Sequence, residues 1–333
     1  MHKLLDAFTW KMMKNKKDLV TDSELIAIMI LEYIVILRYC PISVIIVVIH
    51  LPFISATFSS SYIDNRNIIT DDKFHVKQIY PTKPNGREWF IDMDNPRSDG
   101  LFFITSNKNI TKQEDEGESW RVNDTSIRMN VDTPSGLQQW KNVEITGYVK
   151  IVSAINDSKT DDDAEDGSND DTAAEYDLDF RARSGDHSSE SPCEGTSMIG
   201  LLHADGSIGW KKEIWHTGGY SDEKSKAKVT TEPVINRWVG WKVIIYNINN
   251  DTAVKMESYL DNLNTNYWVK ASEIIDNGEW YAKSSDEEFY SANCGRPKDY
   301  IITEGGPLVT FRSDNLVWDF KSLSVREIVV PGQ

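Results

Sequence analysis

The sequence predicts an all-β fold, an antiparallel sandwich or barrel, from three observations. From about residue 74 onward, short runs of alternating apolar and polar residues follow one another. Gly, Asn, Asp and Pro, which favour tight turns, separate these runs. No stretch of this region keeps a helical periodicity beyond a turn or two. Many short strands at such spacing are typical of a sandwich or a barrel.

The N-terminal region predicts one hydrophobic membrane or signal helix. Residues 25–58 are almost entirely apolar, and about 20 such residues suffice to span a bilayer. Five lysines precede them, which favours a cytoplasmic basic segment over residues 1–24. The segment is either an uncleaved anchor or, with a start at Met29, a signal cleaved near residues 53–56. Both alternatives lead through a linker over 59–73 to a β domain over 74–333 outside the cytoplasm.

Cysteine and asparagine usage agrees with export. Cys40 lies in the apolar segment, which leaves Cys193 and Cys294, both in loop-like sequence, to form a disulfide. Four asparagines are followed two residues later by Thr or Ser and could carry glycans outside the cell: Asn109, Asn123, Asn156 and Asn250. The sequence therefore predicts a secreted or membrane-anchored glycoprotein.

The charge of the chain argues against a nucleic-acid partner. The net charge is −16, whereas a phosphate backbone is bound by clusters of Lys and Arg. Eight acids lie within residues 157–171 alone. This run matches a calcium-binding EF-hand loop only at Asp162, Asp166 and Gly167, because Ala164 and Ala173 occupy two ligand positions. We therefore expect a solvated acidic loop there. The sequence predicts no zinc site either, because its six histidines are scattered and no Cys/His set has ligand spacing.

The stretch "EYDLDFRAR" predicts a strand with one apolar and one charged face. Tyr176, Leu178, Phe180 and Ala182 alternate strictly with charged residues, and successive side chains of a strand point to opposite sides. The charged face would carry Glu175, Asp177, Asp179, Arg181 and Arg183. Such a face is either a solvated surface or the floor of a site for polar ligands.

Two segments carry a resemblance to a known superfamily. "RWVGWKVIIYNINNDTAVKMESYLDN" (237–262) and "GGPLVTFRSDNLVWDFKSLSVREI" (305–328) resemble consecutive strands and the closing strands of the concanavalin A-like lectin/glucanase superfamily. The resemblance implies a jelly-roll sandwich, as in lectins, carbohydrate-binding modules, glucanases and polysaccharide lyases. It also implies one structural calcium near the termini, for which Asp314, Asn315 and Asp319 are candidates.

The sequence can be tested for two catalytic functions, glycoside hydrolysis and β-elimination. Retaining glucanases need two closely spaced carboxyls, one of which carries a proton. Here Asp179 stands where the family has Glu, and Arg181 would keep it ionised, so hydrolysis is disfavoured. A lyase that cleaves an acidic polysaccharide by β-elimination needs a cation, a base and an acid. The candidate cations are Arg181 and Arg183, the candidate base is His216, and the candidate acid is Tyr220, Tyr246 or Tyr259. The motifs of jelly-roll alginate lyases are incomplete in this sequence.

Carbohydrate binding without cleavage is the favoured prediction. Sugars stack on aromatic rings, while charged and amide groups take their hydroxyls. Trp215 shares strand parity with Lys211 and Glu213, which predicts an exposed sugar platform on a strand next to the charged one. The predicted ligand-binding residues are Glu175, Asp177, Asp179, Arg183, Lys211, Glu213, Trp215 and Tyr246. A polysaccharide lyase is the first alternative, and a structural cell-surface protein is the second.

Overall fold

The computed structural model describes residues 70–105, 108–114, 117–155, 177–187 and 190–332. Strands dominate these residues, with one short 3₁₀ helix, η2 (Pro96–Ser98), and one short α-helix, α3 (Asp286–Ser291). The strands are β1 (Glu88–Phe90), β2 (Phe102–Ile104), β3 (Ile110–Gln113), β4 (Ser119–Val131), β5 (Val143–Ala154), β6 (Asp177–Ser184), β7 (Ser197–His203), β8 (Ser207–Glu213), β9 (Lys224–Lys228), β10 (Val239–Ile248), β11 (Ala253–Asp261), β12 (Val269–Asp276) and β13 (Leu308–Glu327).

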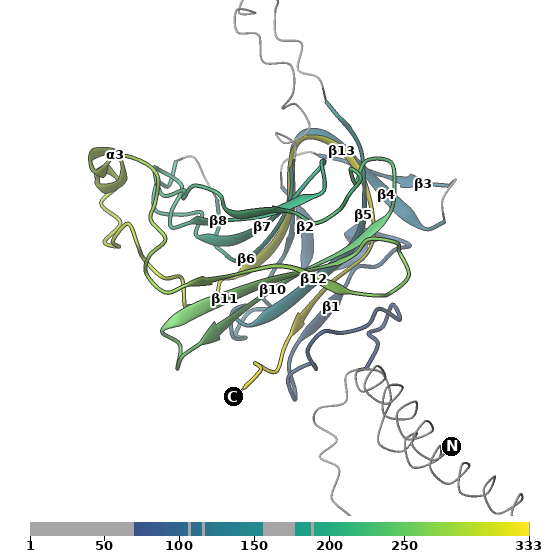
Figure 1. Ribbon diagram of the computed structural model, residues 1–333, viewed down its shortest axis with the longest axis horizontal. Helices are drawn as coiled ribbons and strands as arrows, with labels where there is room; N and C mark the ends of the chain where they lie inside the picture. Colours follow the sequence, from purple (N-terminus) through teal and green to yellow (C-terminus); the bar gives the residue numbers. More distant parts are fainter. Residues whose placement is uncertain (1–69, 106–107, 115–116, 156–176, 188–189, 333) are drawn as a thin grey trace, which may run out of the picture. The chain divides into compact units, whose positions relative to one another are not determined.

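The strands pair in the order β12-β11-β10-β5-β13-β6-β7-β8-β9, and the pairs of named strands are antiparallel. One long strand, β13, belongs to both layers. Its residues 308–313 pair with β6 and its residues 316–327 pair with β5, while β4 and β1 lie along its other edge. We call β6–β9, with residues 308–313 of β13 and the residues of β4 that pair with them, the first sheet. The second sheet is β5 with β10–β12 and residues 316–327 of β13. Figure 1 shows β6, β7 and β8 as one layer over β10, β11 and β12.

The core lies between these two sheets. Phe180 of β6 stacks on Trp241 of β10, with ring centroids 4.3 Å apart. Gly200 of β7 is needed for close approach, because a Cβ there would lie 2.7 Å from Val243 of β10. β12 also contacts β8 and β9, so the two ends of the strand path meet across the core. The predicted all-β antiparallel sandwich is confirmed.

The predicted alternation of β6 is confirmed over most of its length. Leu178, Phe180 and Ala182 are fully buried in the core, which turns the charged residues of the strand to the outer face of the first sheet. Glu175 lies outside the described residues.

The outer face of the second sheet carries a buried charge cluster. Glu144 Oε1 lies 2.8 Å from both Lys242 Nζ and Arg326 Nη2, and all three side chains are at most 1% exposed. The segment before β1 covers them, since the amides of Ile79 and Tyr80 donate to Glu144 Oε2. Burial alone would raise the pKa of Glu144, but Lys242 and Arg326 outweigh it and lower the pKa to about 2.

Several predictions concern residues outside the described part. The basic segment, the apolar segment over 25–58, the acidic run and Asn156 all lie there. Among the residues that the structure describes, no helix has the length and apolar character needed to cross a bilayer. The Cys193–Cys294 disulfide is confirmed. The described sequons, Asn109, Asn123 and Asn250, are exposed.

Candidate ligand-binding site

Five strands form the outer face of the first sheet, and four of them carry charged side chains there. Residues that pair directly across neighbouring strands share a face. One such row runs from β4 through β13, β6 and β7 to β8 as Arg128, Arg312, Asp179, Leu201 and Gly209. The adjacent row is Asn130, Thr310, Arg181, Ile199 and Lys211. The face therefore combines guanidinium, carboxylate, amide and hydroxyl groups.

Arg181 organises the middle of this face. Its guanidinium bonds to Asp179 and lies 3.2 Å from Glu213 Oε2. Burial alone would lower its pKa, but Asp179 and Glu213 together raise it. Arg181 is only 4% exposed, so both of its carboxylate partners are inside the protein. It holds Glu213 in place and is not free to neutralise a substrate carboxylate, contrary to its predicted catalytic role.

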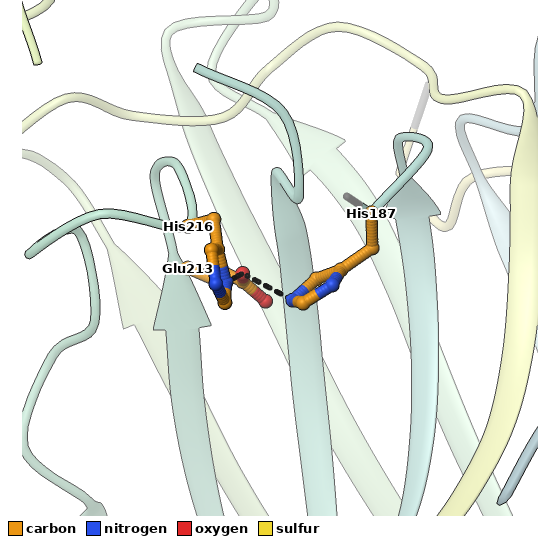
Figure 2. Close-up of side chains that lie close together, drawn as sticks. All are labelled: His187, Glu213 and His216. Carbon is orange, nitrogen blue, oxygen red and sulfur yellow. Dashed lines mark ion pairs between the residues drawn. The ribbon is translucent and has the colours of Figure 1, made fainter. Parts of the chain in front are cut away.

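Two histidines and a tyrosine surround Glu213 at the end of β8. Glu213 is fully buried, with Oε1 3.4 Å from His187 Nε2 and 3.8 Å from His216 Nδ1. Figure 2 shows both imidazoles turned toward this carboxylate. The Tyr220 hydroxyl lies 3.4 Å from His187 Nε2. Burial would raise the pKa of Glu213, but His187 and Arg181 lower it, whereas burial and the Glu213 charge raise the pKa of Tyr220.

The loops that carry the two histidines are fixed to each other. The His216 amide donates to the Glu194 carbonyl over 2.7 Å, and the disulfide from Cys193 ties the same loop to Cys294 beyond α3. Gly195 has φ +89°, and a Cβ there would lie 2.5 Å from Glu213 Oε1. Only glycine lets the backbone pass this close to the carboxylate.

Arg128 and Arg312 form a pair of neighbouring cations whose charges and hydrogen-bond donors are only partly matched by acceptors. They face each other across β4 and β13, an arrangement that is destabilising for like charges. Arg312 pairs with Asp314 over 2.7 Å, yet its buried Nε has no hydrogen-bond partner. No described carboxylate lies within ion-pair distance of Arg128. Burial, reinforced by Arg181 and Arg312, lowers the pKa of Arg128 to about 10.

Asp177 lies further along the same face. Burial, together with the charge of Asp179, raises its pKa to about 7, while Lys211 and His203 act in the opposite direction. Lys211 and Glu213 do lie on this face, as predicted. They belong to β8, however, and β7 separates them from β6.

Trp215 is not a sugar platform, so this prediction is wrong. It is 1% exposed and stacks on Phe289 of α3, with centroids 4.1 Å apart. The strand ends at Glu213, and the Ile214 amide donates to the Gly219 carbonyl in the following turn. Strand parity therefore no longer applies at Trp215.

Arg183 has also left the predicted charged face. The pairing of β6 with β13 shifts next to it, and its φ is +57°, which marks a bulge. Its guanidinium donates to the carbonyls of Lys141 and Ile302. Because Arg183 is 1% exposed, it supports the surrounding loops and does not contact a ligand.

Tyr246 and Tyr259 lie on the other sheet, in β10 and β11. They accompany Glu257, to which Tyr259 donates over 3.4 Å, and a pocket there includes Tyr246 and Glu257. The sequence predicted these tyrosines in the same site as His216, and that placement is wrong. Tyr220 is the predicted tyrosine that reaches the site.

The candidate calcium ligands near the C-terminus are engaged with cations. Asp319 accepts from Arg121 over 2.6 Å and pairs with Lys150 over 3.0 Å. Asp314 pairs with Arg312. These two carboxylates are therefore neutralised by side chains of the chain itself.

Sequence reasoning missed His187, Arg128 and Arg312. His187 lies four residues beyond the quoted stretch "EYDLDFRAR", in a loop after the strand, where no periodicity assigns its direction. Arg128 and Arg312 alternate with apolar residues in "SIRMNV" and "LVTFRS", which was a signal for an outward face. Their pairing depends on a strand register that spans 184 residues of sequence.

The chain was compared with protein families, curated proteins and solved structures. No protein-family model and no curated protein matches the sequence. Among solved structures, peanut lectin in complex with a 9mer peptide matches at 7% identity over 74% of this chain and 100% of its own, with a TM-score of 0.39. Arcelin-5, a lectin-like defence protein from Phaseolus vulgaris, matches at 8% identity over 73% and 98%, with a TM-score of 0.36.

Alginate lyase Aly36B matches at 8% identity over 67% of this chain and 88% of its own, with a TM-score of 0.35. With these TM-scores and identities, the ligand and the activity have to follow from the geometry of the chain itself.

Proposed function

We propose that this chain binds an anionic polysaccharide on the outer face of the first sheet. The observation that carries the proposal is the Arg128–Arg312 pair, in which two guanidiniums face each other, the buried Arg312 Nε has no hydrogen-bond partner, and no described carboxylate lies within ion-pair distance of Arg128. A uronate carboxylate would supply the missing negative charge, because guanidinium binds carboxylates through paired hydrogen bonds. Lys211, which lies on the same face and is partly exposed, would take a sugar hydroxyl.

Replacing Arg128 by glutamine is expected to weaken polyuronate binding about 10- to 100-fold, because hydrogen bonds to charged groups contribute about 1.5–3 kcal/mol. Calorimetric titration of the full chain with alginate, polygalacturonate and hyaluronan measures this. Arg97→Gln makes the same charge change in the exposed helix η2 and should leave the affinity unchanged. Equal affinity of wild type and Arg128→Gln for every polyuronate bound would remove the basis of the proposal.

A polysaccharide lyase is the second candidate, favoured by the contact between the Tyr220 hydroxyl and His187 Nε2. In β-elimination a base takes the C5 proton, a C4–C5 double bond forms, and the glycosidic oxygen leaves with a proton from an acid. Incubation with the same polyuronates distinguishes the two functions. A rise in ultraviolet absorbance from unsaturated sugar ends that disappears in Tyr220→Phe would establish cleavage. If no polysaccharide raises the melting temperature, a structural role takes precedence.

We also propose that the β domain lies outside the cytoplasm, through an N-terminal anchor or signal. The disulfide supports this location, because such bonds persist in oxidising compartments. In a eukaryotic expression host, mass spectrometry should find glycans on the exposed Asn109, Asn123 and Asn250. Complete absence of glycans from all three sequons in the purified chain would contradict the location.

A further inference from the structure

We propose that His187, Glu213 and His216 bind a divalent transition metal ion, with Zn²⁺ as the first candidate. The three donor atoms are His187 Nε2, Glu213 Oε1 and His216 Nδ1, and all lie within 4.8 Å of one another. Two imidazoles and one carboxylate are a ligand set that suits zinc and its neighbours. This inference does not depend on polyuronate binding, but it competes with the lyase alternative, because the metal and the Tyr220 hydroxyl would both use His187 Nε2.

The two oxygens of Glu213 have different surroundings. Oε2 lies 3.2 Å from Arg181 and accepts from Ser197 over 3.3 Å. Oε1 is buried and has no hydrogen-bond partner, and the same is true of His216 Nδ1. Leaving such atoms unsatisfied is costly. A metal ion between them would satisfy both.

The distances fit ligands around a metal better than hydrogen bonds. Nε2 and Nδ1 lie 3.4 and 3.8 Å from Oε1, beyond the usual N–H···O range of about 2.7–3.2 Å. Metal–ligand bonds of about 2.0–2.2 Å place tetrahedral ligands about 3.3–3.5 Å apart. The two imidazoles, whose centroids are 4.2 Å apart, would have to rotate until both nitrogens point at one ion.

The surroundings of the three ligands are rigid on one side and open on the other. Gly195 leaves room beside Glu213 Oε1 that a side chain would fill, and the disulfide fixes the adjacent loop. The His187 and His216 side chains remain 19% and 31% exposed. An ion held by three protein atoms would therefore keep a position open toward the solvent and the sheet face, as in zinc sites that bind a water or a substrate.

Titration of the full chain with Zn²⁺ after chelator treatment and dialysis tests the site. We expect one tight site per chain, weakened about tenfold or more in both His187→Ala and His216→Ala, since even outer-shell changes cost about 10- to 100-fold. Titration with Co²⁺ should give an absorption spectrum of nitrogen and oxygen ligands. A thiolate-to-metal band would instead indicate binding at Cys40.

His75→Asn is the matched control, because His75 is exposed and its φ of +59° suits asparagine. It should bind Zn²⁺ as the wild type does. Zn²⁺ should also raise the melting temperature of wild type and of His75→Asn. The rise should be smaller in the other two variants, whose melting without metal verifies that they are folded. Absence of a tight site in the wild type, or its retention in either His187→Ala or His216→Ala, would overturn the proposal.

Discussion

Replacing Glu144 by glutamine is expected to lower the free energy of unfolding by about 3–5 kcal/mol, the usual effect of removing one partner from a buried ion pair. Lys242 and Arg326 would remain buried without the carboxylate that both contact at 2.8 Å. Urea unfolding near pH 7 measures the loss. Glu273→Gln is the control, because Glu273 is 47% exposed and exposed ion pairs contribute about 0–1 kcal/mol.

The same cluster predicts how stability depends on pH. The pKa of Glu144 is lowered to about 2, below its value in an unfolded chain. Its ionised form therefore stabilises the fold above about pH 4.5. This contribution is lost as the pH falls toward 2. The pH dependence should be smaller in Glu144→Gln over this interval.

A third variant separates the charge from the packing. Replacing Glu144 by leucine together with Lys242→Met and Arg326→Met removes all three charges, and we expect much of the lost stability to return. If Glu144→Gln unfolds like Glu273→Gln, the cluster contributes little and the argument from buried charge fails.

Removing the disulfide is expected to have an effect of similar size. Cys193 and Cys294 close a loop with a sequence separation of 101, and the chain-entropy model gives about 4–5 kcal/mol for such a loop. The double variant Cys193→Ser, Cys294→Ser should therefore melt well below the wild type. Cys40→Ser, which changes the third cysteine of the chain, should melt as the wild type does.

The disulfide also has an expected effect on the candidate metal site. Its loss would release the loop of Glu194 and Gly195, which lies against His216 and Glu213. Zn²⁺ affinity of the folded double variant should therefore fall, although no ligand atom is changed. Unchanged stability and affinity would mean that the remaining contacts alone hold this loop.

The sequence predicted the sandwich because alternation is a local property. Leu178, Phe180 and Ala182 faced the core as expected, since each lies within a regular strand. The prediction failed at Arg183, where a bulge interrupts the period, and at Trp215, which lies beyond the end of its strand. The alternation of side chains between the two faces therefore predicts their direction only within an uninterrupted strand.

The candidate site was only partly predictable, because most of it is assembled across strands and loops. His216 and Tyr220 were identified by their chemistry, and Glu213 by the strand parity that it shares with Lys211. His187 and Arg128 required the loop path and the strand register, which a single sequence does not contain. Tyr246 and Tyr259 carry the hydroxyl that an acid would need, but they lie on the second sheet, away from His216.

The long strand β13 has a consequence for how the protein acquires its fold. It pairs with β1, β4, β5 and β6, although it follows all of them in the sequence. Neither sheet can complete its strand pairing before residues 308–327 have been synthesised. Until then, the edges of β1, β4, β5 and β6 that pair with β13 stay unpaired. Pairings this distant in sequence slow folding, and unpaired edges invite association between chains. Production of the protein is therefore expected to depend on protection of these edges until synthesis is complete.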